Sequence, residues 1–249
     1  LLERLGSTVT KAGADSWLIK SGERSGDLDR DLVEAIRGSI LLLGPLLTSV
    51  GEATLTPPGG DVIGLRRLDT HLWGLSALGA SFTIEDHHIT LRAKQLPLIG
   101  GDIFLDEASV TATENVIMAA SLAAGESIIT NAACEPHVQD LCTMLTLMGC
   151  PIDGIGSNRL RIVGQTRLHG CSFRLGSDYM ETGSFIGLAA ATGGEALLTG
   201  VDVEHLRMIK LGFERIGITF DVDGPSSIWV GRHQSRILTK EVAGHTDKI

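Results

Sequence analysis

The stretch Leu75-Ser76-Ala77-Leu78-Gly79-Ala80-Ser81-Phe82-Thr83-Ile84 decides the fold of this chain. Leu75 and Leu78, four and one positions before Gly79, lie on one face of a helix, and glycine favours the left-handed conformation that ends a helix. The alternation of apolar and polar residues after Gly79 is typical of a β-strand. The stretch therefore predicts a helix that ends at a glycine and leads directly into a β-hairpin.

The same pattern occurs four times along the chain. Each copy has apolar residues one and four positions before a glycine and a strand-type apolar residue three positions after it. The four glycines are spaced by 73, 70 and 68 residues and are Gly6, Gly79, Gly149 and Gly217. A second signal, a Gly-Glu pair that follows an Ala- and Leu-rich stretch and opens a strand, lies upstream of the last three. These pairs are Gly51-Glu52, Gly125-Glu126 and Gly194-Glu195.

The repeated unit is therefore helix, strand, helix and hairpin, in about seventy residues. Three complete units and one half unit are present. A unit that lays helices on a small sheet cannot bury its apolar face alone, so neighbouring units must share the burial. We expect an α+β fold in which the repeats close around a common helical core with their sheets outward.

Composition restricts the class of protein. The 249 residues are 43% hydrophobic and 20% charged, which describes a globular protein with one large or two modest domains. The net charge of −9 argues against nucleic acid as the main partner. The longest apolar run, from Ile40 to Leu47, contains a Gly-Pro break and is too short to span a membrane. The four cysteines lack the spacing of a zinc site or a disulfide framework, which fits a reducing cytosol.

The stretch from Pro57 to His71 is the first candidate for chemistry. Its three glycines allow close approach of the backbone to a ligand, and Arg66 and Arg67 supply forked donors that suit phosphate or carboxylate. An exposed turn with solvated charges would explain the same residues. Asp69 or Thr70 is predicted to cap the following helix, and capping alone would account for Asp69.

Three other segments each allow a structural and a functional interpretation. A helix is predicted from Asp31 to Leu43, and Arg37 at the edge of its apolar stripe either extends to solvent or points into a site. The run Ser109-Val110-Thr111 either caps the helix of the second repeat or presents backbone N–H groups to an anion. The run Glu181-Thr182-Gly183 is either a capping arrangement or the edge of a site.

Four motifs together become specific. They are Gly59-Gly60-Asp61-x-x-Gly64-x-Arg66-x-x-Asp69, Arg37-x-Ser39-x-x-x-x-Gly44-Pro45-Leu46, Asn131-Ala132-Ala133-x-Glu135-Pro136 and Glu181-Thr182-Gly183. With these motifs the chain resembles the UDP-N-acetylglucosamine 1-carboxyvinyltransferases, which are enolpyruvyl transferases of peptidoglycan precursor synthesis. The resemblance runs across essentially the whole chain and covers the middle portion of a full-length member.

The resemblance implies a fold of inside-out α/β barrel domains, each built from three repeats, in agreement with the repeat found in the sequence. Residues 1–176 are then expected to be the first domain without its N-terminal segment. Residues 177–249 are expected to be the first repeat of a truncated second domain. The active site of the complete enzyme would lie between the two domains, with the Asp61 loop as a lid.

The implied reaction transfers the enolpyruvyl group of phosphoenolpyruvate to the 3′-hydroxyl of UDP-N-acetylglucosamine and releases phosphate in the cytoplasm. The resemblance assigns catalysis to Asp61 and Arg66, where Arg66 matches the contact to phosphoenolpyruvate. No metal or organic cofactor is implied. The residues that match substrate contacts are Arg37, Arg66, Arg67, Leu68, Asp69, Thr70, Glu107, Ala108, Ser109 and Val110.

Asp61 occupies the position where many members carry a cysteine as proton donor. A carboxylate is a far weaker nucleophile than a thiolate, so we expect insensitivity to fosfomycin, which alkylates that cysteine. Arg67 stands where a proline is usual, and Leu41 replaces a typical tryptophan. The family's N-terminal Lys-Asn pair and its later catalytic Asp and Arg lie outside these 249 residues, so we expect the chain to be inactive alone.

Two alternatives to this function stay open. A sister enolpyruvyl transferase that acts on shikimate 3-phosphate shares the fold, although the Asp61 loop and the Glu181-Thr182-Gly183 motif favour the nucleotide-sugar enzyme. A non-catalytic paralogue that binds UDP-sugar as a sensor or scaffold would account for the departures at Leu41 and Arg67.

Overall fold

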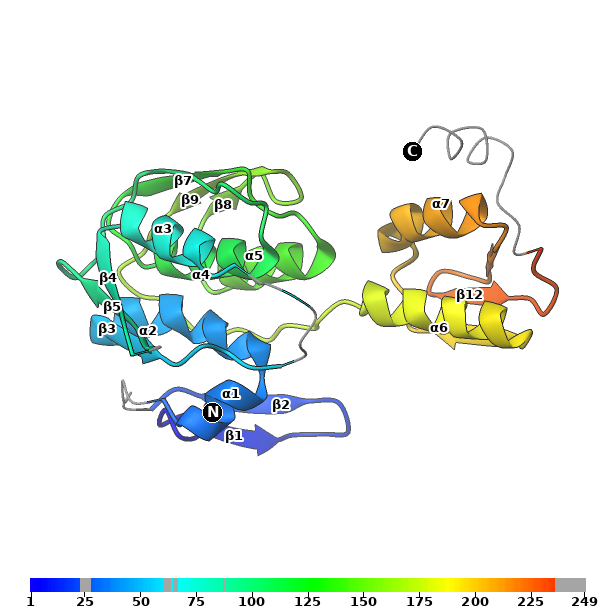
Figure 1. Ribbon diagram of the computed structural model, residues 1–249, viewed down its shortest axis with the longest axis horizontal. Coiled ribbons are helices and arrows are strands. Elements are labelled where there is room, and N and C mark those ends of the chain that lie inside the picture. Colours follow the sequence, from blue (N-terminus) through cyan, green and yellow to red (C-terminus); the bar gives the residue numbers. More distant parts are fainter. Residues whose placement is uncertain (23–27, 61–63, 65–66, 87, 236–249) are drawn as a thin grey trace. The chain divides into compact units, whose positions relative to one another are not determined.

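The computed structural model describes residues 1–22, 28–60, 64, 67–86 and 88–235 (Figure 1). The chain divides into two compact units, Leu1–Phe173 and Arg174–Ile249. The assignment of 1–176 and 177–249 to two domains of a longer enzyme stays a prediction. Within the described residues, no helix has the length and the apolar character needed to cross a membrane.

The first unit alternates helices with short strands. Its strands are β1 (Thr8–Lys11), β2 (Trp17–Lys20), β3 (Glu52–Leu55), β4 (Ala80–Glu85), β5 (His88–Ala93), β6 (Asp102–Phe104), β7 (Glu126–Thr130), β8 (Ile152–Asp153) and β9 (Arg159–Val163). Its helices are α1 (Arg30–Ala35), the 3-10 helix η1 (Arg37–Leu42), α2 (Leu43–Val50), α3 (Asp69–Ala77), α4 (Val110–Ala120) and α5 (Pro136–Leu147).

The second unit contains one helix-strand-helix-hairpin repeat. Its elements are α6 (Tyr179–Thr192), β10 (Ala196–Thr199), the 3-10 helix η2 (Val203–Leu206), α7 (Arg207–Arg215), β11 (Asp221–Val222) and β12 (Ser227–Val230). Its core includes Ile186, Ala190, Ile228 and Val230, each at most 1% exposed. Helix α6 packs against the strands β10 and β12 of this unit.

The sheets confirm the repeat. Each complete repeat forms an antiparallel sheet in which the second strand of the hairpin lies between the other two strands, in the orders β3-β5-β4, β7-β9-β8 and β10-β12-β11. The half unit supplies the hairpin β1-β2 alone. Strand β6 is an addition to the second repeat and pairs in parallel with β7.

The predicted helix-ending glycines have the expected backbone. Gly6, Gly79, Gly149 and Gly217 have φ of 87°, 100°, 100° and 75°, in the left-handed region that favours glycine. The helix before the third Gly-Glu pair ends one residue earlier than expected, because Gly193 and not Gly194 has positive φ, 66°.

The Gly-Glu pairs have a structural role that the sequence pattern did not specify. In each repeat the glutamate at the start of the first strand pairs with an arginine on or just after the central strand. The pairs are Glu52 with Arg92 at 2.9 Å, Glu126 with Arg161 at 2.5 Å and Glu195 with Arg232 at 3.6 Å. These exposed ion pairs contribute little stability individually, but they favour the same pairing of strands in every repeat.

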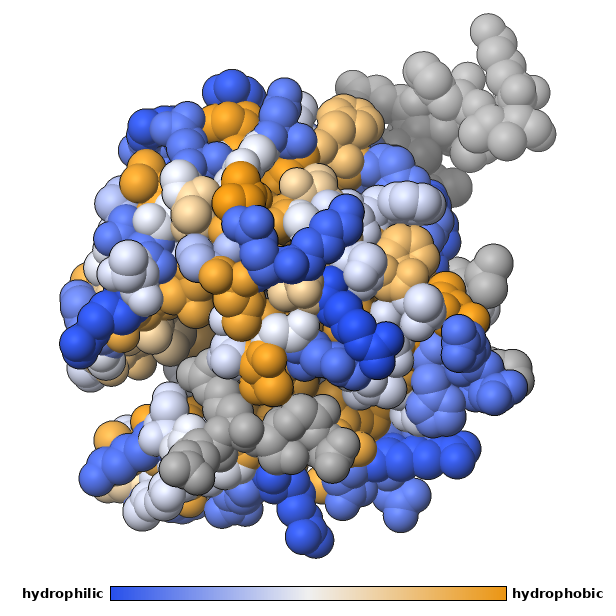
Figure 2. All heavy atoms as spheres, turned by 90° about the vertical axis from the view of Figure 1, so that its left-hand side faces the viewer, coloured by the Kyte–Doolittle hydropathy of each residue, from blue (hydrophilic) through white to orange (hydrophobic). Residues whose placement is uncertain are grey.

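Helix α4 is the centre of the first unit. Eight of its eleven residues are buried, and it contacts η1, α2, α3, α5 and β9. In Figure 1 the helices α2 to α5 lie in the interior of this unit, with the strands β3 to β5 and β7 to β9 on the outside. The face in Figure 2 shows hydrophobic residues scattered among hydrophilic ones, as on an ordinary solvent-facing surface. The expected helical core with outward sheets is therefore present.

The single helix predicted from Asp31 to Leu43 is wrong. The chain leaves the helix at Ile36, which has extended φ and ψ of −141° and 129°, and continues as η1. The buried hydroxyl of Ser39 stabilises the break because it lies 3.0 Å from the carbonyl of Val33 and 2.7 Å from that of Ile36. The predicted apolar stripe still holds at Val33, Ile40 and Leu43, which are at most 1% exposed, whereas Ile36 is exposed.

Asn115, fully buried on α4, joins three other helices. Its amide nitrogen donates to the carbonyl of Ile40 at 2.8 Å and to Nδ1 of His71 at 2.9 Å, and its oxygen accepts from the N–H of Gly44 at 2.8 Å. Glycine is required at position 44, because a Cβ there would lie 2.5 Å from the backbone oxygen of Asn115. The close packing of α2 on α4 therefore depends on these two residues together.

Replacing Asn115 by Ala should destabilise the protein by about 3 kcal/mol or more, because the buried Gly44 N–H and the Ile40 carbonyl lose their side-chain partner. Urea denaturation measures the change in the free energy of unfolding. Ser184 is the matched control, since it lies ten residues before Gly194 as Asn115 lies ten residues before Gly125, yet it is exposed. Ser184→Ala should change stability by less than about 0.5 kcal/mol. A loss below about 1 kcal/mol for Asn115→Ala would contradict the role of this side chain.

Candidate functional site

The glycine stretch of the first candidate segment packs against the break between α1 and η1. The N–H of Gly59 donates to the carbonyl of Val33 at 3.4 Å, and a Cβ at Gly59 would lie 1.4 Å from the oxygen of Glu34. Gly60, with φ of 90°, packs so closely that a Cβ there would lie 3.2 Å from the backbone nitrogen of Arg37. Only glycine fits this approach, so Arg37 lies beside the start of the Asp61 loop.

The two residues expected to be catalytic, Asp61 and Arg66, lie outside the described residues. The expected substrate contacts on either side of them are described. Arg37 is the first residue of η1, and Arg67 and Leu68 lead into α3. Arg67 and Leu68 therefore follow the Asp61 loop in sequence, and Arg37 lies beside the start of this loop.

Arg67 links two segments of the expected substrate site. Its Nε and Nη2 donate to the two carboxylate oxygens of Asp69 at 2.9 and 2.6 Å, and Nη2 also donates to Asp106. Nη1 lies 3.8 Å from Oε2 of Glu107. Asp106 in turn accepts a hydrogen bond of 2.8 Å from the hydroxyl of the buried Thr70. The structure thus brings Arg67, Asp69 and Thr70 together with Glu107.

These contacts keep both aspartates ionised. The hydrogen bonds from Arg67 lower the pKa of Asp69, and the hydrogen bonds from Thr70 and Arg67 lower the pKa of Asp106. One guanidinium faces three carboxylates in this cluster, so its local charge is negative. A phosphate group is therefore not expected to bind at Arg67 itself.

The second expected segment leads into the N-terminus of α4. Glu107 and Ala108 are exposed, Ser109 is the N-cap, and Val110 is the first helical residue. The hydroxyl of Ser109 accepts from the N–H of Ala112 at 3.4 Å. Capping therefore explains Ser109. For α3, in contrast, the prediction that Asp69 or Thr70 is the N-cap is wrong, because the helix starts at Asp69 after Leu68.

His71 connects this site to the helical core. Its Nδ1 accepts from Asn115, so its other nitrogen, Nε2, carries the proton and lies 3.2 Å from the hydroxyl of Thr111. Burial, with a smaller contribution from the positive charge of Arg37, lowers the pKa of His71 to about 4. The imidazole is therefore neutral at physiological pH and is a structural hydrogen-bonding group there rather than a proton donor to substrate.

Glu114, one turn into α4, is only 8% exposed and faces α5. Burial and the nearby carboxylate of Glu135 raise the pKa of Glu114 to about 7. The Oε2 atom of Glu135 is itself buried and has no hydrogen-bond partner. Near neutral pH the two carboxyl groups therefore carry less than two full negative charges.

Glu114 should make stability fall as pH rises from about 4.5 to about 7, with little further change above pH 8. Its folded pKa of about 7 exceeds the unstructured value of 4.5, so its stabilisation is complete below pH 4.5 and is lost as pH passes 7. His71 has the opposite effect: its contribution is present above 6.5 and is lost as pH falls through about 4. The two contributions oppose each other between about pH 4.5 and 6.5, so the effect of Glu114 is obtained as the difference between the unmodified protein and a variant at Glu114, in which the contribution of His71 cancels.

Between pH 5 and 8 the contribution of Glu114 to the free energy of unfolding should fall by roughly 2 kcal/mol. Glu114→Gln should remove most of this slope, as measured by urea denaturation at several pH values. Glu126→Gln is the control, because Glu126 is exposed and paired with Arg161 on the sheet. Equal slopes for the unmodified protein and Glu114→Gln would contradict the raised pKa.

Asp106, Glu114 and Asn115 belong to this region but were not predicted from the sequence, and His71 was predicted only as the last residue of the candidate stretch. Asp106 directly precedes the expected segment from Glu107 to Val110 and was not distinguished from it. His71 and Asn115 interact over 44 positions in the chain, and no local pattern predicts such a pair.

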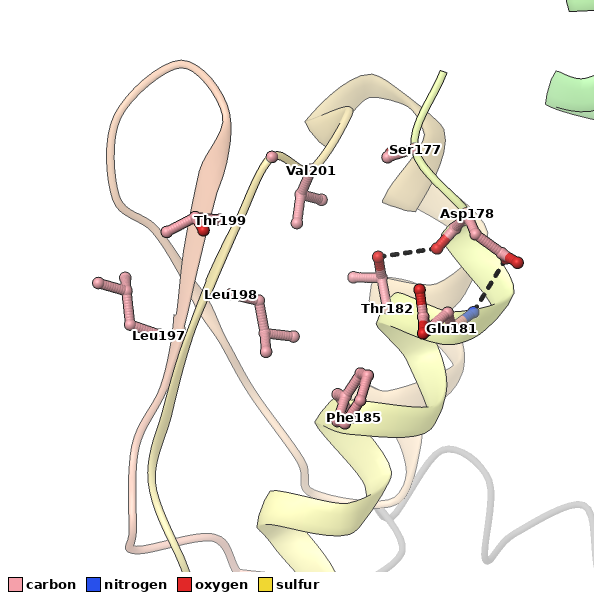
Figure 3. A pocket seen from close by; sticks show the side chains of 10 residues that line it. Ser177, Asp178, Glu181, Thr182, Phe185, Leu197, Leu198, Thr199 and Val201 are labelled. Atoms are coloured by element: carbon pink, nitrogen blue, oxygen red, sulfur yellow. Dashed lines mark hydrogen bonds between the residues drawn. The ribbon is translucent and has the colours of Figure 1, made fainter. Parts of the chain in front are cut away.

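The motif Glu181-Thr182-Gly183 lies in the first turns of α6. Asp178 caps this helix through the N–H groups of Met180 and Glu181, at 2.9 and 3.0 Å. Glu181 and Thr182 also line a pocket of about 350 Å³ between α6 and β10 (Figure 3). The remaining lining residues are Ser177, Asp178, Phe185, Leu197, Leu198, Thr199, Gly200 and Val201.

No metal site is evident in the part of the chain that the structure describes. There, no three His, Cys, Asp or Glu side chains are grouped as the ligands of an ion. The acidic cluster around Arg67 is neutralised in part by that arginine.

The chain is similar to known proteins both in sequence and in fold. The sequence model of the EPSP synthase (3-phosphoshikimate 1-carboxyvinyltransferase) family matches residues 1–249, so the chain belongs to this family. The structure is similar to the enolpyruvyl transferase NikO from Streptomyces tendae, with a TM-score of 0.76 and 20% identity over 97% of this chain and 60% of that one. An EPSP synthase from Acinetobacter baumannii matches with a TM-score of 0.65 and 20% identity over 92% and 54%. These similarities confirm the expected fold.

Within the family, the chain is similar in sequence to proteins named UDP-N-acetylglucosamine 1-carboxyvinyltransferase. It is 47% identical to that of Borrelia garinii subsp. bavariensis over all of this chain and 58% of the relative. It is 49% identical to that of Treponema denticola over 91% of this chain and 52% of the relative. These similarities confirm the expected resemblance. The chain spans a little over half the length of the curated relatives it matches.

Proposed function

We propose that the protein containing this chain transfers the enolpyruvyl group of phosphoenolpyruvate to the 3′-hydroxyl of UDP-N-acetylglucosamine and releases phosphate. The observation that carries the proposal is the network in which Arg67 and Thr70 contact Asp106 and Arg67 lies near Glu107, because it joins two segments expected to contact the nucleotide sugar. The names of relatives at 47 and 49% identity support this substrate. The substrates place the reaction in the cytoplasm, as a step of cell-wall precursor synthesis.

In the proposed reaction, the 3′-hydroxyl of the sugar attacks C2 of phosphoenolpyruvate and gives its proton to the family's later Asp, which lies outside these 249 residues, while Asp61 protonates C3. The resulting tetrahedral intermediate loses phosphate as the C2–C3 double bond re-forms and C3 returns a proton. Arg66 would bind the phosphoenolpyruvate anion through its fork of donors. Asp61 has a reference pKa near 3.9, so it would need desolvation when the loop closes to act as an acid. His71 is not the acid, because it is neutral at physiological pH.

Two other functions compete with this proposal. The name of the matching family favours a 3-phosphoshikimate enzyme, but the relatives at 47 and 49% identity carry the nucleotide-sugar name. A non-catalytic protein that binds UDP-sugar would keep the network around Arg67 and lose the chemistry. Activity of the complete protein distinguishes the three.

The gene product that contains this chain should release phosphate from phosphoenolpyruvate only when UDP-N-acetylglucosamine is present. Asp61→Asn should reduce kcat by about 100-fold or more, because an amide cannot donate a proton to C3. Asp153→Asn on the exposed hairpin β8-β9 is the control and should leave the rate unchanged. Phosphate release with shikimate 3-phosphate instead would favour the sister enzyme. Binding of UDP-N-acetylglucosamine without phosphate release would favour the non-catalytic protein.

Fosfomycin should not inactivate the protein, because the carboxylate of Asp61 is a poor nucleophile toward its epoxide. Residual activity is measured after incubation with the drug, before and after dilution. Asp61→Cys supplies the thiolate and should become sensitive, which serves as the positive control. Rapid irreversible inactivation of the unmodified protein would contradict Asp61 as the residue in this position.

A further inference from the structure

We infer that Asp106 is a positioning residue of the proposed transferase, which holds the two nucleotide-sugar segments in register through Arg67 and Thr70. We name Asp106, Arg67, Thr70 and Asp69 the Asp106 clamp. The inference rests on the proposed function for its ligand. The clamp itself rests on the contacts of the described residues.

The two oxygens of Asp106 hold different parts of the site. Oδ1 accepts a hydrogen bond of 2.8 Å from the Thr70 hydroxyl, and Oδ2 accepts from Nη2 of Arg67. The same guanidinium donates to both oxygens of Asp69 at the start of α3. A bidentate arginine fixes direction as well as distance. The segment that precedes α4 is therefore tied at two points to the segment that opens α3.

Buried residues fix the backbone at both ends of the Asp106 clamp. Leu105, next to Asp106, is 1% exposed, and its N–H donates to the carbonyl of Thr130 at 3.1 Å. Its carbonyl accepts from the side chain of Asn131 at 2.8 Å. Thr70 is also 1% exposed and lies within the first turn of α3. The side chains of Arg67 and Asp106 are themselves 44% and 48% exposed, so their ion pair contributes little stability, and the buried neighbours fix the backbone from which it extends.

The position of Arg67 gives the clamp its link to the reaction. Arg67 is covalently next to Arg66, the residue expected to contact phosphoenolpyruvate, so the clamp restrains the backbone on that side of Arg66. The donors Nε and Nη2 of Arg67 are directed at Asp69 and Asp106, and Nη1 faces Glu107. Arg67 therefore acts through the residues it holds. A proline at this position could not form the clamp.

Substitutions at Asp106 separate its hydrogen bond with Thr70 from its ion pair with Arg67. Asp106→Ala removes both contacts and should raise the Kd of UDP-N-acetylglucosamine about 10-fold by isothermal titration calorimetry of the complete protein. Asp106→Asn keeps an acceptor for Thr70 and should raise this Kd about 3-fold. In both variants kcat at saturating sugar should stay within about twofold of the unmodified protein, because the clamp positions the sugar and does not react.

A charge exchange tests the link to Arg67. Arg67→Asp and Asp106→Arg should each weaken binding about 10-fold, and the double variant should recover to within about 3-fold of the unmodified protein. Glu52→Ala, which removes an exposed pair with Arg92 on the sheet, is the matched control and should leave binding unchanged. Failure of the double variant to recover would overturn the link between Asp106 and Arg67.

Two further outcomes separate this inference from the proposed function. Unchanged sugar binding in Asp106→Ala, or a loss of kcat with an unchanged Kd, would overturn the positioning role. Absence of sugar binding by the unmodified protein would overturn the proposed function and the ligand of the clamp together. Hydrogen exchange without ligand tests the clamp alone, since Asp106→Ala should speed exchange at the N–H groups of Thr70 and His71. Unchanged exchange there would overturn the clamp as a restraint.

Discussion

The side chain of Asn115 makes the hydrogen bonds on which the first unit depends. A buried amide group needs hydrogen-bond partners for its oxygen and its nitrogen. Here one side chain of α4 forms hydrogen bonds with residues of η1, α2 and α3. The Gly44 contact lets α2 approach α4 more closely than any side chain would allow. The relative positions of four helices are thus set by a polar group at the centre of an otherwise apolar core, and this restricts the core to one arrangement.

The same hydrogen bonds extend from the core to the candidate site. His71 is held by Asn115 on one side and by Thr111 on the other, and it directly follows Thr70 of the Asp106 clamp. Arg37 lies close enough to the imidazole to disfavour its charged form, and the chain at Gly60 packs on the backbone of Arg37. The site is therefore built on the starts of η1, α3 and α4. The residues that border the site are packed against the helical core, whereas the Asp61 loop belongs to a glycine-rich connection in the sequence.

The fold repeats one structural unit, and the copies of this unit differ at particular positions. The three complete repeats share their strand order and an equivalent Glu–Arg pair on each sheet. The copies differ at positions that are buried in α4: this helix carries Asn115 and Glu114, whereas the equivalent positions of α6 are Ser184 and Gly183. A shared scaffold with local exceptions fits a protein whose sites are added to a common framework.

The sequence by itself determined the repeat, the helix-ending glycines and the hairpins, because these depend on local periodicity and on backbone freedom at glycine. The segments expected to contact substrate came from the resemblance to the family. Only the tertiary structure decided the break at Ile36, the start of α3 at Asp69, the partners of Arg67 and the roles of Asn115, His71 and Asp106. Several of these depend on contacts between residues far apart in the chain, such as Asp106 with Thr70 and Asn115 with His71. The break at Ile36, in contrast, is stabilised by the nearby Ser39. Burial also decided the charge of Glu114 and His71, since a pKa follows from the surroundings of a side chain in the folded protein and not from its neighbours in sequence.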